Sequence, residues 1–375
     1  MRRSVRGQWR WGALLAVVAL LVALPSVVGA RPVSASGVSA ADLLARVRAS
    51  AAVGWSGYGE SRGSLVVPDV QELAGLPSLV GDTTRTRAWW RGSRDWRVDA
   101  LTLAGENDVA QESSGTYTWS SADRAVTRLE GQLPVRLPTA ADLVAPVLGR
   151  RLAGTADTQV RRLPARRVAG HDAPGLRLLP DRPERTTVAS VDLWAEPRTG
   201  LPLRVEVHAK GAPAPALTAL LLDVDLRRPP AERTDFVPPA DAALADGDAP
   251  DLAALADRFA PYRLPDSLAG LARTDRVGAF RDVAGVGTYG GGFASFAVVP
   301  LPRRLAGQVI RKVAGATTVG AGGETPETAE VSTPLLNGVV GRRGDRGYLV
   351  AGTVPVPRLR SALDALFTHP PPRVR

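Results

Sequence analysis

The middle of the chain alternates apolar and polar residues in a way that predicts β-strands. Residues 187–195, 201–208 and 220–226 each place apolar side chains at every second position, with charged residues between them. Alternation of period two is typical of an antiparallel sheet with one face in the core and the other in water. The segment 196–200 (Glu-Pro-Arg-Thr-Gly) has the composition of a turn and joins the first two of these strands.

Strands nearer the N-terminus are less regular and rich in large aromatic residues. Residues 84–91 contain Trp89 and Trp90, residues 95–103 contain Trp96, and residues 116–120 contain Trp119. The segment Arg91-Gly92-Ser93-Arg94 predicts a turn between the first two strands. Together the strands predict a mainly β fold, a strongly curved antiparallel sheet of roughly eight or more strands that wraps an apolar hollow.

Helical spacing is confined to short segments. Ser39 and Asp42 resemble a capping box before the stripe Leu43, Leu44 and Val47, which predicts a helix there. A second Thr-x-x-Asp start predicts a helix over 139–148. Beyond residue 258 we expect a small α+β unit, with strands at 293–299, 335–340 and 347–354, helices at 302–313 and 357–367, and a loop over 314–333.

Aromatic usage marks a domain boundary. Past residue 30 every tryptophan precedes residue 195, whereas every phenylalanine follows residue 235. Two cores built from different residues suggest two domains, and the Pro, Ala, Asp and Gly residues between them are typical of a linker. We therefore expect a curved-sheet domain over 36–240, a linker over 241–257 and a small C-terminal α+β domain over 258–370.

The N-terminus has the three-part pattern of an export signal. Four arginines precede an apolar run that ends at Leu24, and Val28-Gly29-Ala30 offers a small-residue cleavage site. An uncleaved membrane anchor fits the same residues, because Gly12 to Ala30 is close to the length that spans a bilayer. Under both interpretations residues 1–30 are a signal peptide or anchor, and the rest of the chain lies outside the cytoplasm in the cell envelope.

Charge and composition narrow the possible functions. Lys+Arg 47 against Asp+Glu 37 gives a net charge of +10, and all but two of the basic residues are arginines. These arginines alternate with acidic residues and form no continuous basic stripe, so we expect no nucleic-acid binding. The chain has no cysteine and only His171, His208 and His369 as histidines. We expect no metal, no cofactor and no enzyme activity.

The few motifs that suggest chemistry have simpler explanations. Residues 285–290 match G-x-G-x-x-G, but a strand-like run follows them where a dinucleotide site needs a helix, so they predict a glycine-rich hairpin. Asp223 and Asp225 project to the polar side of one strand, as a solvated face does. His208 ends a strand and His171 lies in a turn, so neither position indicates a catalytic assembly. An exported hydrolase or sugar-binding protein is the alternative from another functional class.

The tryptophans are the most informative candidates for ligand binding. Large amphipathic rings on the concave side of a sheet suit acyl chains, and the competing interpretation is that they are ordinary core residues. The nearby arginines are either the wet face of the sheet or partners of an anionic headgroup. The candidates for the apolar cavity are Trp89, Trp96, Trp119, Trp194, Leu101 and Leu103, and those for a headgroup are Arg87 and Arg97. We predict no catalytic residue.

These strand and turn motifs resemble those of a known superfamily. An export signal and a short helix precede them, and this order of motifs resembles that of the superfamily of lipoprotein carriers (LolA type) and sigma-E regulatory proteins (RseB/MucB type). The likeness covers about residues 40–240. The matching segments are Trp89–Asp99, Tyr117–Ser120, Val168–Leu178, Val191–Trp194, Thr199–Val205 and Phe236–Pro239.

The resemblance implies an unclosed antiparallel β-barrel, or half-barrel, with a hydrophobic cavity under short lid helices that binds acyl chains without catalysis. Carriers of this type have one domain, whereas the sigma-E regulators add a C-terminal domain, so residues 258–370 favour the regulator. Its expected partners are the acyl chains of a lipid or lipoprotein and the extracytoplasmic domain of an anti-sigma factor. The hypothesis is thus a membrane-proximal sensor of envelope stress, and the alternative within the fold is a lipid or lipoprotein carrier.

Overall fold

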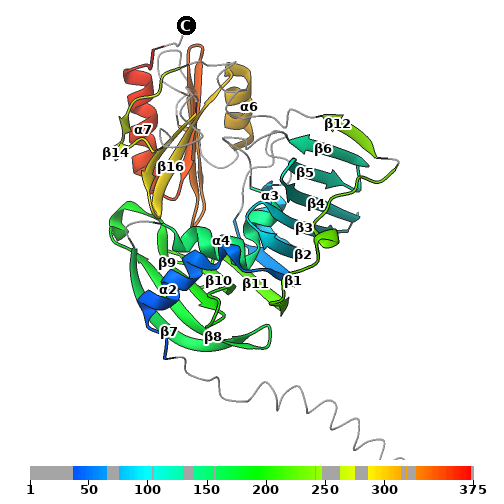
Figure 1. The fold of residues 1–375 in the computed structure, drawn as a ribbon. Coiled ribbons are helices and arrows are strands. Elements are labelled where there is room, and N and C mark those ends of the chain that lie inside the picture. Colours follow the sequence, from blue (N-terminus) through cyan, green and yellow to red (C-terminus); the bar gives the residue numbers. More distant parts are fainter. Residues whose placement is uncertain are drawn as a thin grey trace, which may run out of the picture.

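A twelve-stranded sheet forms the larger part of the computed structural model, and a six-stranded sheet forms the smaller part (Figure 1). The structure describes residues 37–65, 76–103, 105–129, 138–155, 158–240, 242–246, 262–274, 286–313, 318–319 and 327–372. The predicted signal or anchor at 1–30 therefore lies outside the described residues. Within the described ranges, no helix combines the length and the apolar composition needed to cross a bilayer.

The large sheet has the spatial order β12-β6-β5-β4-β3-β2-β1-β11-β10-β9-β8-β7. Eleven of its strands pair antiparallel with their neighbours, and β12 adds in parallel beside β6. In this order β12 and β7 are two separate edges, so the sheet is curved but not closed, as predicted. Its strands are β1 (Trp55–Gly63), β2 (Thr83–Gly92), β3 (Asp95–Thr102), β4 (Gly105–Glu112), β5 (Gly115–Ser120), β6 (Ala125–Leu129), β7 (Thr158–Val168), β8 (His171–Pro180), β9 (Val188–Ala195), β10 (Pro202–Ala209), β11 (Leu217–Asp225) and β12 (Ala243–Asp246).

Short helices cover one face of this sheet, which we call the inner face (Figure 1). Helix α2 packs on β7 and β8, α4 packs on β10 and β11, α3 packs on β1 and β2, and η3 contacts β3. Ser39 caps α2 by accepting a hydrogen bond from the Asp42 backbone, as the capping pattern predicted. The helical elements are α2 (Ala40–Ala49), η1 (Ser50–Ala52), α3 (Leu76–Gly81), η3 (Ala140–Leu143), α4 (Ala145–Ala153), η4 (Pro183–Arg185) and η5 (Ala231–Arg233).

The core lies between these helices and the inner face. Leu43 and Val47 of α2, Leu193 of β9 and Leu203 and Val205 of β10 belong to one cluster of fully buried side chains. The charged residues between them on β9 and β10 point to the opposite face, which we call the outer face. Burial of the apolar positions, at roughly 25 cal/mol per Å² of surface removed from water, fixes which face of each strand meets the helices.

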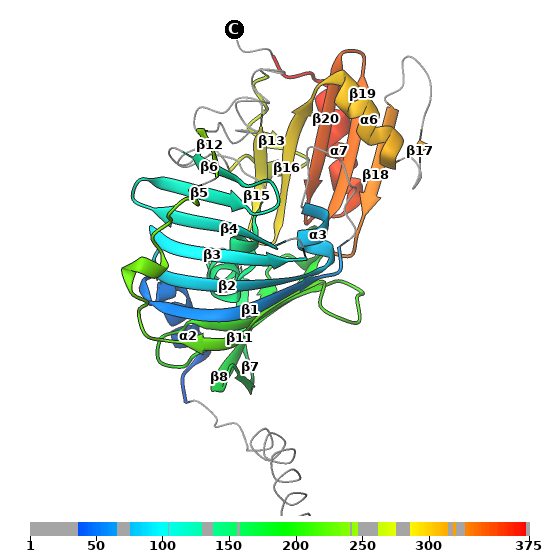
Figure 2. The same cartoon turned by 90° about the vertical axis from the view of Figure 1, so that its right-hand side faces the viewer.

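The C-terminal domain has its own sheet in the order β15-β16-β20-β19-β18-β17, and α6 and α7 both pack on it (Figure 2). Its core contains Tyr289, Tyr348 and Leu359. The elements are β13 (Ser267–Leu268), β14 (Leu271–Ala272), β15 (Gly287–Gly291), β16 (Ala294–Leu301), α6 (Arg303–Val313), β17 (Thr318–Val319), β18 (Glu327–Ser332), β19 (Asn337–Arg343), β20 (Arg346–Gly352) and α7 (Val356–Thr368).

The two sheets meet at a small polar junction. Thr186, just before β9, donates its hydroxyl toward the carbonyls of Phe293 (2.5 Å) and Thr353 (2.9 Å) of the C-terminal domain. The Thr187 hydroxyl donates to the Leu335 carbonyl. Phe293 and Leu335 also belong to the core cluster of the large sheet. The junction therefore combines hydrogen bonds with burial of side chains contributed by the second domain.

Most predicted elements are confirmed, and two expectations are corrected. The G-x-G-x-x-G segment leads into the hairpin of β15 and β16, and the two C-terminal helices lie where the spacing placed them. The helix predicted over 139–148 is two elements, η3 and α4, separated at Val144. The loop predicted over 314–333 contains β17 and β18, because a short strand needs few apolar residues when its neighbour β19 supplies the hydrogen bonds. The predicted linker begins with β12, and residues 247–261 lie outside the described residues.

Candidate functional site

Three tryptophans form a continuous stack on the inner face. The ring of Trp90 on β2 lies 5.7 Å from that of Trp96 on β3 and 6.5 Å from that of Trp55 on β1, nearly parallel to both. Trp55 is fully buried, whereas Trp96 is only half-buried and lies at the margin of the core cluster. The stack thus extends from the core toward solvent on the side of the sheet that the helices cover.

Arg150 of α4 lies on this stack without a charged partner. Its guanidinium carbon is 4.7 Å from the centre of the Trp90 ring. Among the described residues Nη1 of Arg150 is buried with no hydrogen-bond partner, and no carboxylate contributes to its electrostatic environment. Burial lowers the pKa of Arg150 to about 10. A cation with buried atoms and no counter-ion lowers the free energy of unfolding. An anionic group bound beside the guanidinium would recover that loss.

The cavity candidates taken from the sequence do not share one face. The strand register places Trp96 on the inner face, opposite Trp90, and it places Trp89 on the outer face, opposite Arg97. Trp119 lies opposite Asp108, and Trp194 lies opposite Arg204 and Gly175, both on the outer face. Since successive side chains of a strand point to opposite faces, Trp89 and Trp90 could not both line the same cavity.

Trp194 is almost fully buried on the outer face, with 2% of its surface exposed. Its indole Nε1 donates to the Pro164 carbonyl at 3.0 Å, and the Arg166 guanidinium lies 4.0 Å from its ring centre. Gly175 leaves the space that the indole occupies, because a Cβ there would lie 2.7 Å from Nε1. These contacts give Trp194 a packing role.

Five of the predicted residues gather on the outer face of β2 to β5, namely Trp89, Trp119, Leu101, Arg87 and Arg97. Leu103 lies in the following turn and is fully exposed. Both predicted headgroup arginines have carboxylate partners: Arg87 pairs with Glu106 at 2.9 Å, and Arg97 contacts Asp99 at 2.6 Å and Asp108 at 2.7 Å. Their role in ligand binding stays a prediction.

Asp99 and Asp108 are buried carboxylates that the sequence analysis missed. They lie directly opposite each other on β3 and β4, with 3% and 2% of their surfaces exposed. Arg97 bridges them, but Oδ1 of Asp108 has no hydrogen-bond partner. Burial raises the pKa of Asp108 to about 7, and the charge of Asp99 adds to this effect. Like charges opposite each other in a sheet destabilise the fold, so this pair stores free energy that protonation releases.

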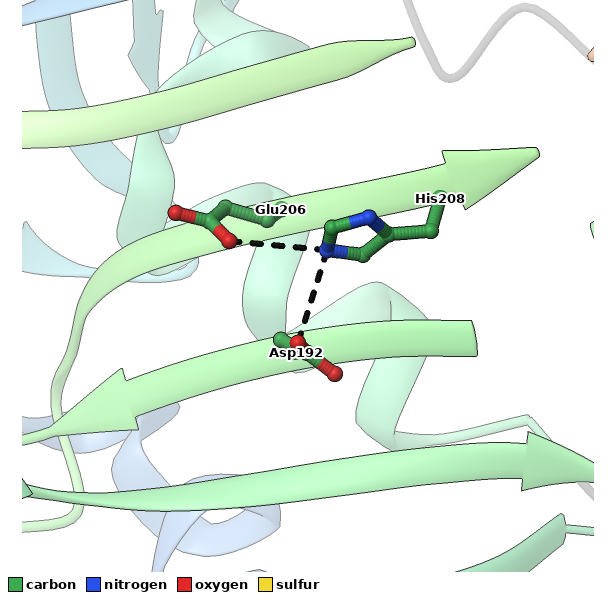
Figure 3. Close-up of side chains that lie close together, drawn as sticks. All are labelled: Asp192, Glu206 and His208. Carbon is green, nitrogen blue, oxygen red and sulfur yellow. Dashed lines mark ion pairs between the residues drawn. The ribbon is translucent and has the colours of Figure 1, made fainter. Parts of the chain in front are cut away.

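A second polar cluster lies on the outer face of β8 to β10. Nε2 of His208 is 3.4 Å from both Oδ2 of Asp192 and Oε2 of Glu206 (Figure 3). Arg177 donates to both oxygens of Asp192, whereas Arg166 and Arg204 contact Oε1 of Glu206. In the described chain no hydroxyl hydrogen-bonds His208, although Ser190 lies opposite it on β9.

The described residues also line two surface hollows that lie apart from these clusters. One of about 520 Å³ lies beside Trp89 on the outer face, lined by Ser56 and by arginines of the segment 227–233. Arg227 there forms a forked ion pair with Asp225, which holds the pKa of that carboxyl at about 2. The other, of about 420 Å³, lies on the C-terminal domain, and its lining residues are Arg303, Arg304, Gln308, Arg311 and Arg342.

The known proteins to which this chain is similar are solved structures. No family model matches the chain. No curated protein matches it. The structure is similar to a chain of the Pseudomonas aeruginosa MucA/MucB complex, at 16% identity and a TM-score of 0.49, over 86% of this chain and 96% of that one.

Two further similar structures cover about half of this chain. A LolA-superfamily protein from Nitrosomonas europaea is 15% identical, with a TM-score of 0.25 over 53% of this chain and 99% of that one. The Mycobacterium tuberculosis lipoprotein LppX is 10% identical, with a TM-score of 0.28 over 51% and 98%. MucB and LolA-superfamily proteins are thus among the solved structures that this chain resembles, as its strand and turn motifs indicated. At such identities the likeness concerns the fold, and the proposals below rest on this chain's own residues.

Proposed function

We propose that the protein is a non-enzymatic, extracytoplasmic binding protein for an anionic amphiphile, such as a lipid or the acylated end of a lipoprotein. The observation that carries the proposal is Arg150, a partly buried side chain whose Nη1 is buried and which has no carboxylate partner in the described chain. It lies on the Trp90 ring, next to the half-buried Trp96. An acyl chain would pack along the tryptophans, and its anionic head would pair with Arg150.

The half-covered inner face supports this assignment. The described helices pack mainly on β1, β2, β7, β8, β10 and β11, and η3 reaches β3. Trp96 on β3 and Val109 on β4 are apolar, half-buried and packed against the core cluster. They form the apolar margin at which a chain could enter between sheet and helices, and its burial would contribute about 0.8 kcal/mol per methylene group.

A fluorescent fatty acid tests the proposal. The purified full chain should bind cis-parinaric acid, and Arg150→Met should weaken binding about tenfold, which corresponds to roughly 1.4 kcal/mol. The methyl ester of the same probe has no charge for Arg150 to recognise, so the substitution should not change its affinity. Binding is followed by the increase in probe fluorescence on titration with protein.

The neighbouring residue provides a matched control. Arg151 is exposed and paired with Asp142, so Arg151→Met should leave binding unchanged. Arg150→Met should also raise the melting temperature, because it removes a buried charge without breaking an ion pair. A chain that takes up neither probe, or an Arg150→Met variant that binds the acid as tightly as the original, would contradict the proposal.

Within this class we favour a sensor over a carrier. In the superfamily that the sequence resembles, the regulators that bind the extracytoplasmic part of an anti-sigma factor have a second domain, whereas the carriers have one domain. Thr186 and Thr187 make direct hydrogen bonds between the two domains. These contacts favour a sensor, because ligand binding in one domain could change the conformation of the other. We expect the protein to capture a membrane-anchored anti-sigma factor from envelope extracts and to release it when fatty acid is added. A protein that instead exchanges lipoproteins between membranes would be a carrier.

A further inference from the structure

The imidazole of His208 has an unusual environment on the outer face. Its Nε2 atom is buried, has no hydrogen-bond partner among the described residues and lies 3.4 Å from two carboxylate oxygens (Figure 3). A neutral nitrogen lone pair facing two anions is repulsive. The arrangement therefore requires either a hydrogen on Nε2, which the neutral Nε2–H tautomer also supplies, or a metal ion between the three atoms.

The distances match those expected around a tetrahedral metal. Bonds of about 2.0–2.1 Å from zinc to nitrogen and oxygen place neighbouring ligand atoms about 3.3–3.4 Å apart. Both distances from Nε2 of His208 are 3.4 Å, and the three ligand atoms all lie within 4.8 Å of one another. Two of the three edges thus already have the length of a tetrahedral shell, and the third, between the two carboxylates, is at most 4.8 Å and closes with a small side-chain movement.

The sheet holds the three side chains in place. Glu206 and His208 are two residues apart on β10 and so share a face, and Asp192 on β9 is the direct cross-strand partner of Glu206. Arg204 and Arg166 occupy Oε1 of Glu206, which leaves Oε2 directed at His208. Metal-binding carboxylates commonly have such an outer partner on the second oxygen.

Charge sets a limit on the affinity. Three guanidiniums surround the two carboxylates, and Arg177 contacts the same Asp192 oxygen that faces His208. The side chains of Arg166, Arg177 and Arg204 are 50%, 40% and 30% exposed, so solvent screens much of their repulsion toward an added ion. We therefore expect reversible binding by a site that loads and releases its ion.

We propose that Asp192, Glu206 and His208 form a binding site for a divalent transition metal, with Zn²⁺ as the preferred ion. One imidazole nitrogen and two carboxylate oxygens suit zinc better than calcium or magnesium, which prefer oxygen ligands alone. The His208 side chain is 24% exposed, so the fourth position can be filled by water from the surface. This site lies on the opposite face from Arg150 and does not depend on the proposed lipid function.

Titration of the untagged full chain with zinc tests the site. One equivalent of Zn²⁺ should bind, and Co²⁺ should give the visible absorption bands of a tetrahedral complex. His208→Ala and Glu206→Gln should each weaken zinc binding by at least about tenfold. Glu206→Gln keeps an oxygen for Arg166 and Arg204, so it separates loss of the ligand from loss of the fold.

Another histidine of the same sheet is the control. His171, at the start of β8, lies outside the cluster, so His171→Ala should bind zinc like the original chain. If His208 is instead a protonated bridge between the carboxylates, the chain will bind no zinc at millimolar concentration. That result, or zinc binding that survives both His208→Ala and Glu206→Gln, overturns the proposal.

Discussion

Three side chains are held in unfavourable electrostatic environments, and two of them, Arg150 and His208, carry the functional hypotheses. Arg150 lacks a counter-ion among the described residues, Asp108 lies opposite Asp99, and Nε2 of His208 faces two carboxylates. Perturbed groups of this kind concentrate at functional sites, although structural ion networks also contain them. None is recognisable from the sequence, because each depends on a neighbour that the fold brings in from another element: Trp90 of β2 for Arg150, Asp99 of β3 for Asp108, and Asp192 of β9 for His208.

Asp108 predicts how stability depends on pH. The pKa of the carboxyl is about 7 in the folded chain against the ordinary aspartate value of 3.8, so the folded state binds the proton more tightly. Stability is therefore greatest below pH 4 for this group and falls as the pH rises toward 7. Asp108→Asn removes that loss, and its stability relative to the original chain should increase by up to about 3 kcal/mol between pH 5 and pH 8.

Urea unfolding at the two pH values measures this difference. Glu106→Gln is the control, because Glu106 belongs to the same cluster but its side chain is 35% exposed and pairs with Arg87. An Asp108→Asn variant that follows the pH dependence of the original chain would show that this carboxyl is ionised throughout.

At the scale of elements, the sequence predicted strands and helices where the pattern is regular and strongly apolar. Strands β9 and β10 and helices α2, α6 and α7 lie within a few residues of their predicted positions. The faces of the aromatic strands could not be predicted, since a shift of one residue exchanges Trp89 for Trp90 in the core. Strand β18 was missed because only Ala329 and Val331 are apolar within it, and its pairing with β19 is what makes it a strand.

The β8–β9 pair gives a prediction at this scale. Gly175→Ala would place a methyl group 2.7 Å from Nε1 of Trp194 and 2.8 Å from Cβ of Leu163. Overpacking of this kind should destabilise the chain by about 1–3 kcal/mol, measured by urea unfolding. Gly338 of β19 is the matched control, because a Cβ there meets only Ala351 at 3.7 Å. Equal stability of the two alanine variants would mean that the Trp194 indole moves aside freely.

At the scale of the whole molecule, coupling between the domains depends on a few buried groups. Thr186 is fully buried; its hydroxyl accepts from the Val188 backbone and donates toward the second domain. Thr186→Val keeps the shape but removes the acceptor of the Val188 amide and one of the two donors to each of the Phe293 and Thr353 carbonyls, at a cost of about 1–3 kcal/mol. We expect the original chain to unfold in one calorimetric transition and the Thr186→Val variant to unfold in two. Thr186→Ser keeps the hydroxyl and should unfold as the original does, whereas an unchanged transition in Thr186→Val would place the coupling in Phe293 and Leu335.

Several of the arginines lie on an edge strand of the large sheet, where they affect how that edge meets another chain. An exposed edge strand offers unpaired backbone groups to any other strand and so invites polymerisation. One edge is occupied by β12, which the chain supplies from the segment that follows the first domain. The other edge, β7, contains Arg161, Arg162, Arg166 and Arg167 within eleven residues. A second copy that approached this edge would bring its own four arginines against these, so we expect this strand to disfavour pairing between two copies, even though Arg166 and Arg167 also contact Glu206 and Asp172.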